Sequence, residues 1–181
     1  RVMYRRALFA SVVASILSAC GKTEQAAEPI KKTSNIDTKL AELGIELPEA
    51  AVPIAAYTPF RKVGNMVYIA GQGPAFSGVV GKDFTRDEAY EFAKQAGISV
   101  LSQLKKACDD DLDRVVQCVQ LQGIVRCTDD FTEQHLVING CSELFRDVFG
   151  DAGLAARAAV GTNALPVGFV CEVIATFEIR V

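Results

Sequence analysis

What this sequence lacks excludes several kinds of site. Its 181 residues include no tryptophan, a single histidine (His135) and no pair of cysteines in CxxC spacing, so the common zinc patterns are absent. No basic run is interleaved with aromatic residues, and the 22 acidic residues outnumber the 19 basic ones, which argues against a nucleic-acid partner. The glycine-rich stretch GQGPAFSG lacks the GxGxxG spacing of a phosphate loop. We therefore expect no metal site and no nucleotide cofactor.

The N-terminal region lacks the length of a membrane-spanning helix. The basic RVMYRR precedes an apolar run, ALFASVVASI, that is too short to cross a bilayer. Basic, apolar and small residues in this order are typical of a secretory signal, and the LSAC that ends at Cys20 resembles the bacterial lipoprotein box. We predict a lipoprotein signal peptide over residues 1–19 and lipidation at Cys20, which would anchor the protein in the bacterial cell envelope. An apolar helix that happens to contain a cysteine is the alternative.

Composition divides the rest of the chain into a tether and one domain. Residues 20–35 are polar, turn-prone and without periodicity, which is typical of a flexible tether. Residues 36–181 form the predicted domain. Removal of residues 1–19 takes away three arginines and no acidic residue, leaving 16 basic against 22 acidic residues and a net charge of −6. The five remaining cysteines are odd in number and irregularly spaced, so we expect buried free thiols rather than disulfides.

Hydrophobic periodicity predicts the elements of this domain. We expect a short helix from Asp37 to Gly44, two strands around a turn at Gly64-Asn65, a helix opened by a capping box of Thr85 and Glu88, and a strand with Val115, Val119 and Leu121 on one face. A second helix buries Ile138, Cys141, Leu144, Phe145 and Val148 and ends at Gly150. The final strand alternates strictly, with its apolar face running from Phe169 to Val181.

The order β-β-α-β-α-β-β predicts an α+β domain with two helices on one face of a sheet. The other face of the final strand carries Val170, Glu172 and Ile174, and we expect this face to pack against another subunit. The C-terminal stretch otherwise resembles core, because Arg157 is the only charged residue between Leu154 and Cys171. One cation and one anion, Arg157 and Glu172, therefore stand out. They could form a structural ion pair or a binding site.

Three motifs carry a resemblance to a known family. They are PFxxxGNMVYIAGQ from Pro59, VIN from Val137, and ARAAVGxxxLPxxxxxEV from Ala156. Residues 36–181 resemble the Rid family of reactive intermediate deaminases, also called YjgF-like or endoribonuclease L-PSP proteins. The segment KLAELGIELP is similar to the start of a branch whose substrate is not assigned. The resemblance implies a chorismate-mutase-like fold and a homotrimer with clefts between subunits.

The resemblance also implies roles for particular residues. Active members hydrolyse small 2-imino or enamino acids to 2-oxo acids and ammonia without a cofactor. Arg157 matches the arginine that holds the substrate carboxylate, and Glu172 matches the glutamate that holds the water. Other positions expected at the cleft are Asn139, Gly71, Ala159, Ala70 and Phe60. The last three depart from the family, which has cysteine, serine and tyrosine there, so three polar side chains are lost.

Three functions therefore remain open. The first is an imine or enamine deaminase, in which a guanidinium orients the substrate and a carboxylate of raised pKa takes a proton from water. The second is a non-catalytic module that binds small carboxylates. The third is a ribonuclease, against which the acidic charge and the missing acid–base pair argue. Of the remaining candidates, we expect His135 to be a solvated helix residue, Cys141 to be structural, and Asp109 to Asp111 to form a solvated turn.

Overall fold

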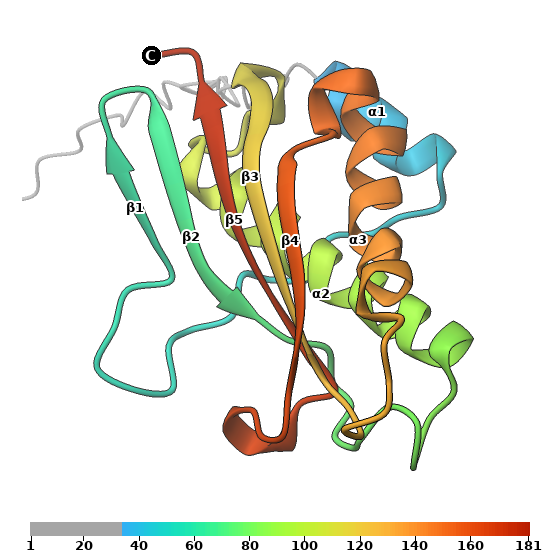
Figure 1. Cartoon of the computed structure of the whole chain (residues 1–181). Coiled ribbons are helices and arrows are strands. Elements are labelled where there is room, and N and C mark those ends of the chain that lie inside the picture. The colour runs from blue at the N-terminus through green and yellow to red at the C-terminus, as the bar shows by residue number, and fades with distance from the viewer. Residues whose placement is uncertain (1–33) are drawn as a thin grey trace, which may run out of the picture. The chain divides into compact units, whose positions relative to one another are not determined.

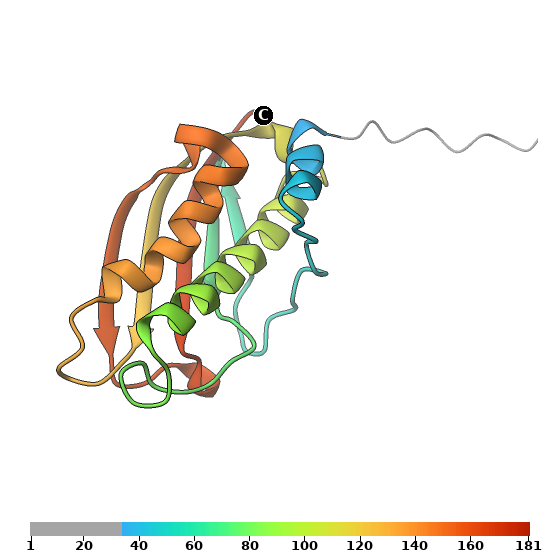
Figure 2. The same cartoon turned by 90° about the vertical axis from the view of Figure 1, so that its right-hand side faces the viewer.

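The domain is a five-stranded sheet with two long helices on one face (Figures 1 and 2). The computed structural model describes residues 34–181; the predicted signal peptide, Cys20 and most of the predicted tether lie outside the described residues. The elements are α1 (Asn35–Glu42), β1 (Phe60–Val63), β2 (Met66–Gln72), α2 (Arg86–Ala107), β3 (Val115–Arg126), α3 (Gln134–Phe149), β4 (Ala156–Thr162) and β5 (Cys171–Ile179). The predicted α+β class and element order are confirmed.

The sheet has the order β1-β2-β5-β3-β4, so the last strand of the chain is also its central strand. β5 pairs antiparallel with both β2 and β3, whereas β3 and β4 are parallel and α3 connects them. Helices α2 and α3 cover one face of the sheet (Figure 2). The opposite face, turned toward the viewer in Figure 1, carries no helix from the described residues. We call it the open face; Tyr68, Ile124, Val160 and Ile174 lie on it.

Local signals in the sequence account for most of the elements. The β1–β2 hairpin turns at Gly64, whose φ of 59° favours glycine. Thr85 and Glu88 form the predicted capping box at the start of α2. All five residues expected to face inward from α3 are buried, and the helix ends at Gly150 as predicted. No helix in residues 34–181 is long and apolar enough to cross a membrane.

The burial pattern of β5 is confirmed and that of β3 is corrected. Alternate β5 side chains from Cys171 to Ile179 are buried against the helices. In β3, Cys118 and Leu121 are buried, while Val119 is 38% exposed. Register shifts between Val115 and Gln117 and between Cys118 and Gln120 change the phase of alternation, so the expected face was wrong.

Two further expectations about the C-terminal stretch are corrected. Val170 is fully buried just before β5 rather than on the open face, because its N–H bonds to the carbonyl of Phe76 and its side chain joins the core. The segment around Arg157 is not core. It is β4, an edge strand with mostly exposed residues, and its apolar composition leaves Val160 52% exposed on the open face.

The cysteines behave as small core residues. Cys108, Cys118, Cys127, Cys141 and Cys171 are all buried free thiols, as predicted. Burial raises the pKa of the Cys141 thiol well above its ordinary value, so this thiol stays protonated and unreactive. The structural role expected for Cys141 is confirmed. Asp109 to Asp111 form a turn, in which Asp109 pairs with Arg114 at 2.8 Å.

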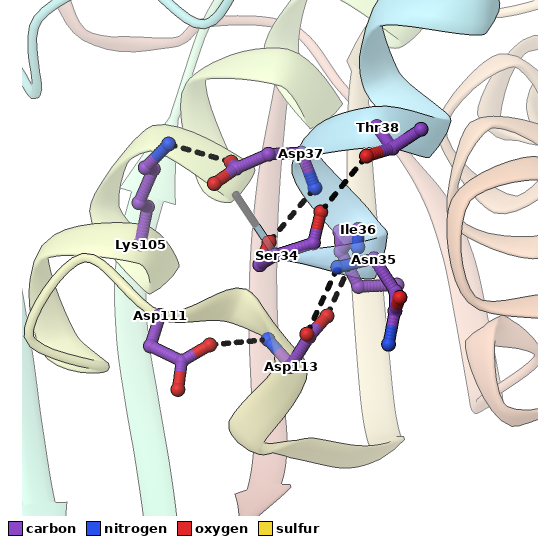
Figure 3. A network of polar contacts seen from close by, with 8 residues as sticks. All are labelled: Ser34, Asn35, Ile36, Asp37, Thr38, Lys105, Asp111 and Asp113. Atoms are coloured by element: carbon purple, nitrogen blue, oxygen red, sulfur yellow. Dashed lines mark hydrogen bonds and ion pairs between the residues drawn. The ribbon is translucent and has the colours of Figure 1, made fainter. Parts of the chain in front are cut away.

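A network of polar contacts fixes α1 against the end of α2 (Figure 3). The helix begins at Asn35, earlier than predicted, because the Ser34 hydroxyl accepts a hydrogen bond from the Asp37 N–H. Both carboxylate oxygens of Asp113 accept from the first backbone N–H groups of the helix, each at 2.9 Å. Burial alone would raise the pKa of Asp37, but the hydrogen bond and charge of Lys105 bring it below its ordinary value.

We expect Asp113→Ala to destabilise the domain by about 1–2 kcal/mol, because two N-terminal N–H groups of α1 lose their acceptor. Urea denaturation measures this change. Asp130→Ala is the matched control, since it removes the same charge from an exposed loop position and should leave the midpoint unchanged. An equal effect of the two substitutions would show that charge, and not capping, is responsible.

Candidate functional site

Glu172 lies in a pocket on the open face of the sheet. Its neighbours on β5, Cys171 and Val173, are buried against the helices, so alternation turns Glu172 to the other side. The pocket has a volume of about 400 Å³. Its lining comes from the α1–β1 connection, the end of β2 and the loop before β5: Ile54, Ala55, Tyr57, Thr58, Ala70, Gly71, Pro166, Phe169 and Glu172.

A β-bulge in β2 makes room for the Glu172 carboxylate. Ile69 pairs with Ala175 and Gln72 with Val173, so Ala70 and Gly71 together stand opposite a single residue of β5. A Cβ on Gly71 would overlap the Glu172 carboxylate. The Gln72 side-chain amide donates to the carbonyls of Ala70 and Gly71 at 3.1 and 3.0 Å, which satisfies two backbone groups at the bulge.

The environment of Glu172 suits proton transfer. Partial burial raises the pKa of its carboxyl above the ordinary value, because desolvation disfavours the charged form. Among residues 34–181 no side chain forms an ion pair with this carboxylate. A carboxylate of raised basicity with open space in front of it can orient a water molecule and accept its proton.

Arg157 is held by α3 at the edge of the sheet. Its Nη1 donates to Asn139 Oδ1 and to Ser142 Oγ, both at 2.9 Å, and its Nη2 donates to the backbone carbonyl of His135 at 3.1 Å. The acceptors come from positions 135, 139 and 142, which share one helical face. The guanidinium is therefore fixed in direction although the side chain is exposed.

These contacts with residues 34–181 use three of the five N–H groups of the Arg157 guanidinium. The Nε–H and one Nη2–H remain. Two donors on one planar group can bind both oxygens of a carboxylate. The arrangement fits an anchor for an anionic group better than a structural ion pair, because no acidic side chain within residues 34–181 forms an ion pair with Arg157.

The fold does not bring Arg157 and Glu172 together within one chain. Arg157 pairs in register with Leu121, and Leu121 with Ala175. Both partners are buried against the helices, so Arg157 projects to the helix face. Glu172 projects to the open face, with β3 between its strand and β4. A single cleft could contain both residues only if two copies of the chain contributed to it.

The other predicted site residues divide between the two locations. Asn139 lies with Arg157, and Ala70 and Gly71 lie with Glu172. Ala159 is half-buried on β4. It projects to the helix face, as does Arg157 two residues earlier on the same strand. Phe60 is not among the residues that line the pocket; it pairs with buried Ile69 and packs on the core. This packing explains an aromatic ring without a hydroxyl at position 60.

A comparison with protein families assigns the chain. The family model described as "YjgF/chorismate_mutase-like, putative endoribonuclease" matches residues 37–179. The chain belongs to the YjgF family. The match covers nearly all of the described domain, and the five-stranded sheet with helices on one face is the chorismate-mutase-like YjgF fold.

Individual relatives agree with the family assignment. Protein TCP17 of Trypanosoma cruzi is 36% identical over 155 residues, which cover 82% of this chain and 96% of the relative. The crystal structure of protein Atu1372 from Agrobacterium tumefaciens, described as of unknown function, is 39% identical, with a TM-score of 0.74 and coverage of 81% and 94%. A structure described as a "putative endoribonuclease" from Shewanella oneidensis MR-1 is 29% identical, with a TM-score of 0.77 and coverage of 80% and 99%.

Sequence reasoning missed several residues of the site in this YjgF-family chain. Ser142 could have been found from its spacing, because it follows Asn139 by one helical turn. Tyr57 and Thr58 could not, since the proline-rich connection that carries them has no periodicity. His135 was expected to be solvated, and its side chain is exposed; only its backbone carbonyl takes part in the site.

A larger pocket lies elsewhere and has a different character. It has a volume of about 620 Å³ and lies between α1, the segment that follows it and α2. Its charged groups include Asp37 and Lys105, which pair with each other at 2.7 Å. The smaller pocket at Glu172 is the candidate site, because there a desolvated carboxylate faces open space. No cluster of three or more metal-binding side chains occurs within residues 34–181.

The close approach of Gly71 to Glu172 gives a direct test of the pocket. We expect Gly71→Ala to displace the carboxylate and to lower any activity that depends on Glu172 by at least about tenfold, since misplacement of a reacting group is costly. Turnover and the thermal unfolding midpoint are both measured for each variant. Gly64→Ala is the control: its φ of 59° makes a side chain strained, but its Cβ would meet nothing within 4 Å. It should lower stability and leave turnover intact.

Proposed function

We propose that this protein hydrolyses small 2-imino or enamino acids to 2-oxo acids and ammonia in a cleft between two subunits. The observation that carries the proposal is Glu172, a desolvated carboxylate without an ion-pair partner in the described domain, which lies in a pocket shaped by Gly71. Arg157, with two N–H donors left over, is the matching anchor for a substrate carboxylate. Glu172 acts as the base and Arg157 as the binding residue.

The reaction needs only a positioned water molecule and one base. The Glu172 carboxylate takes a proton from water while the water oxygen forms a bond to the imine carbon, and the C=N π electrons move to nitrogen. The proton then passes from Glu172 to that nitrogen. Glu172 then takes the hydroxyl proton of this tetrahedral intermediate and delivers it to the nitrogen, so that the C=O bond forms as the C–N bond breaks and ammonia leaves. Because an imine is already electrophilic, most of the acceleration comes from positioning.

Exposed apolar surface supports an assembly that completes this cleft. Val160 and Tyr68 on the open face are 52% and 48% exposed in the single chain, and neighbouring Ile124 and Ile174 are only half-buried. Arg157 and Glu172 project from opposite faces, so a head-to-tail arrangement would place the Arg157 edge of one copy against the open face of the next. Head-to-tail contacts form a ring when the rotation between successive copies closes. We propose a homotrimer of this kind.

The alternatives are weaker on chemical grounds. RNA cleavage, suggested by the description of the Shewanella relative, needs an acid–base pair and several cations for phosphate, whereas the described residues supply the proposed cleft with one carboxylate, Glu172, and one cation, Arg157. A module that only binds small carboxylates would use Arg157 and would not need a basic Glu172. We also propose that the protein is lipid-anchored at Cys20 on the outer side of a bacterial membrane, supported by the signal-like order of residues 1–20.

The test of the proposed function is ammonia release from 2-imino acids that an amino-acid oxidase generates in situ. The expected result is an acceleration over the uncatalysed hydrolysis that is proportional to enzyme concentration. A folded oligomer that binds 2-oxo acids without accelerating ammonia release would instead identify a binding module. Mass spectrometry of the protein expressed in a bacterial host would test lipidation at Cys20.

A further inference from the structure

Among residues 34–181, the lining of the pocket around Glu172 is largely apolar and holds one charged side chain. Apart from Glu172, its lining consists of apolar or small residues and two hydroxyl groups. Its apolar lining comes from Ile54 and Ala55 in the α1–β1 connection and from Pro166 and Phe169 in the loop before β5. With a volume of about 400 Å³, the space is in the range of pockets that enclose whole organic ligands. A methyl group alone would leave most of this space to water.

The wall that contains Phe169 is held in place by three hydrogen bonds. Ser77 Oγ donates to the carbonyl of Val167 at 3.2 Å, and the Gly78 N–H and Arg126 Nη1 donate to the carbonyl of Gly168 at 3.1 and 3.2 Å. Val167 adopts a φ of 47°, which is rare for a β-branched residue. Such a conformation persists where the surroundings enforce it, so this wall is a preformed surface.

The α1–β1 connection that carries Ile54 and Ala55 is tied to α2. Gln103, which is 1% exposed, donates from Nε2 to the carbonyl of Ala51 at 2.7 Å, and the Tyr57 N–H donates to Ala55 at 2.9 Å. The Thr58 hydroxyl is already used, since it donates to the carbonyl of Phe60 at 3.1 Å. The Tyr57 hydroxyl forms no hydrogen bond with another group of residues 34–181. It is therefore the hydroxyl available to a ligand.

We infer that the pocket selects substrates whose side chain is a branched aliphatic or aromatic group over those with a methyl group. The imine nitrogen or the attacking water lies against Glu172, the side chain fills the space between Ile54 and Phe169, and the Tyr57 hydroxyl binds one polar atom. This inference rests on the proposed function, because it names the substrate class of the same pocket. Burial of each additional methylene favours binding, and pockets discriminate by roughly 10–200-fold per such group.

The test measures binding and turnover separately. The probes for binding are three stable 2-oxo acids, pyruvate, 4-methyl-2-oxopentanoate and phenylpyruvate, titrated into the purified protein by calorimetry or NMR. We expect the two larger acids to bind at least about tenfold more tightly than pyruvate. The probes for turnover are the 2-imino acids of alanine, leucine and phenylalanine, with the same order expected in kcat/KM.

Variants connect the preference to the walls. Phe169→Leu and, independently, Ile54→Ser should reduce the preference to about threefold or less; Ile54 is 73% exposed, so its replacement spares the fold. Tyr57→Phe should weaken all three acids alike, by about fivefold. Val52→Ala is the matched control, since Val52 lies on the same segment, is 78% exposed and does not line the pocket.

Each outcome decides the inference. Equal affinity for the three acids, no detectable binding of the larger ones, or a preference that survives both wall variants would overturn it. Selective binding without ammonia release would refute the proposed hydrolysis and leave the selectivity standing. Ammonia release with equal efficiency from all three imines would support the proposed hydrolysis and overturn the selectivity.

Discussion

Glu172→Gln is expected to abolish ammonia release and at the same time to stabilise the protein. Glutamine keeps the shape of the side chain but cannot take a proton from water, so turnover should fall by about 10²–10⁴-fold, the range for loss of a general base. A carboxylate that is desolvated for function carries a cost to the folded state. The same substitution removes that cost.

The pH dependence of the stability gain has a definite sign. Burial raises the pKa of Glu172 in the folded protein, so between its unfolded and folded pKa values the folded state binds more protons than the unfolded state. Stability therefore falls as pH rises through that window. The thermal midpoint of Glu172→Gln should exceed that of the wild type at pH 7, and the difference should close as the pH falls below the unfolded pKa.

Turnover of the wild type should depend on pH through the same carboxyl group, and should rise as Glu172 loses its proton. The acid limb of kcat/KM should have an apparent pKa above the ordinary glutamate value, because the base must be deprotonated. Glu178→Gln is the matched control, since Glu178 lies on the same strand and points to the same face but outside the pocket. It should change neither turnover nor its pH profile. Equal losses in the two variants would remove the special role of Glu172.

Arg157→Ala is expected to act mainly on binding. Loss of two charge-assisted hydrogen bonds to a substrate carboxylate should lower kcat/KM by at least about 100-fold, since hydrogen bonds to charged groups contribute about 1.5–3 kcal/mol each. Arg157→Lys should recover only part of the loss, because an ammonium cannot bind both oxygens through a planar fork.

Two controls separate binding from folding in this series. Arg146→Ala removes an exposed cation from the same helix that holds Arg157 and should have no effect. Calorimetric titration with 2-oxo acids should show the affinity loss directly. Unchanged affinity in Arg157→Ala would mean that Arg157 is structural.

The sequence was informative wherever the structure depends on near neighbours along the chain. The strict alternation of β5, the capping box of Thr85 and Glu88, and the glycine turn at Gly64 each act over a few residues, and each was predicted. The position of Val119 was not, because bulges in β3 depend on how it pairs with β5. A pairing register between distant segments leaves no periodic signal.

The same distinction applies to the site. The residue types at Arg157 and Glu172 indicated their chemistry, but the faces to which they project follow from strand order and from α3. Within a single chain Phe60 packs on the core, and its place at a cleft between subunits stays a prediction. Tyr57, three residues earlier, lines the pocket but lies in an irregular segment before β1, where no periodic pattern could place it.

In the proposed oligomer, each reaction site takes Arg157 from one copy and Glu172 from another. The most direct measurement is ammonia release by mixed oligomers of Arg157→Ala and Glu172→Gln chains, formed by co-expression in equal amounts. At substrate concentrations below the wild-type KM, each variant alone should keep no more than about 1% of wild-type activity. If adjacent copies share the cleft, about a quarter of the clefts in a random head-to-tail ring should contain both intact residues, so about a quarter of wild-type activity should return. Mixed oligomers that stay as inactive as the separate variants would contradict the account.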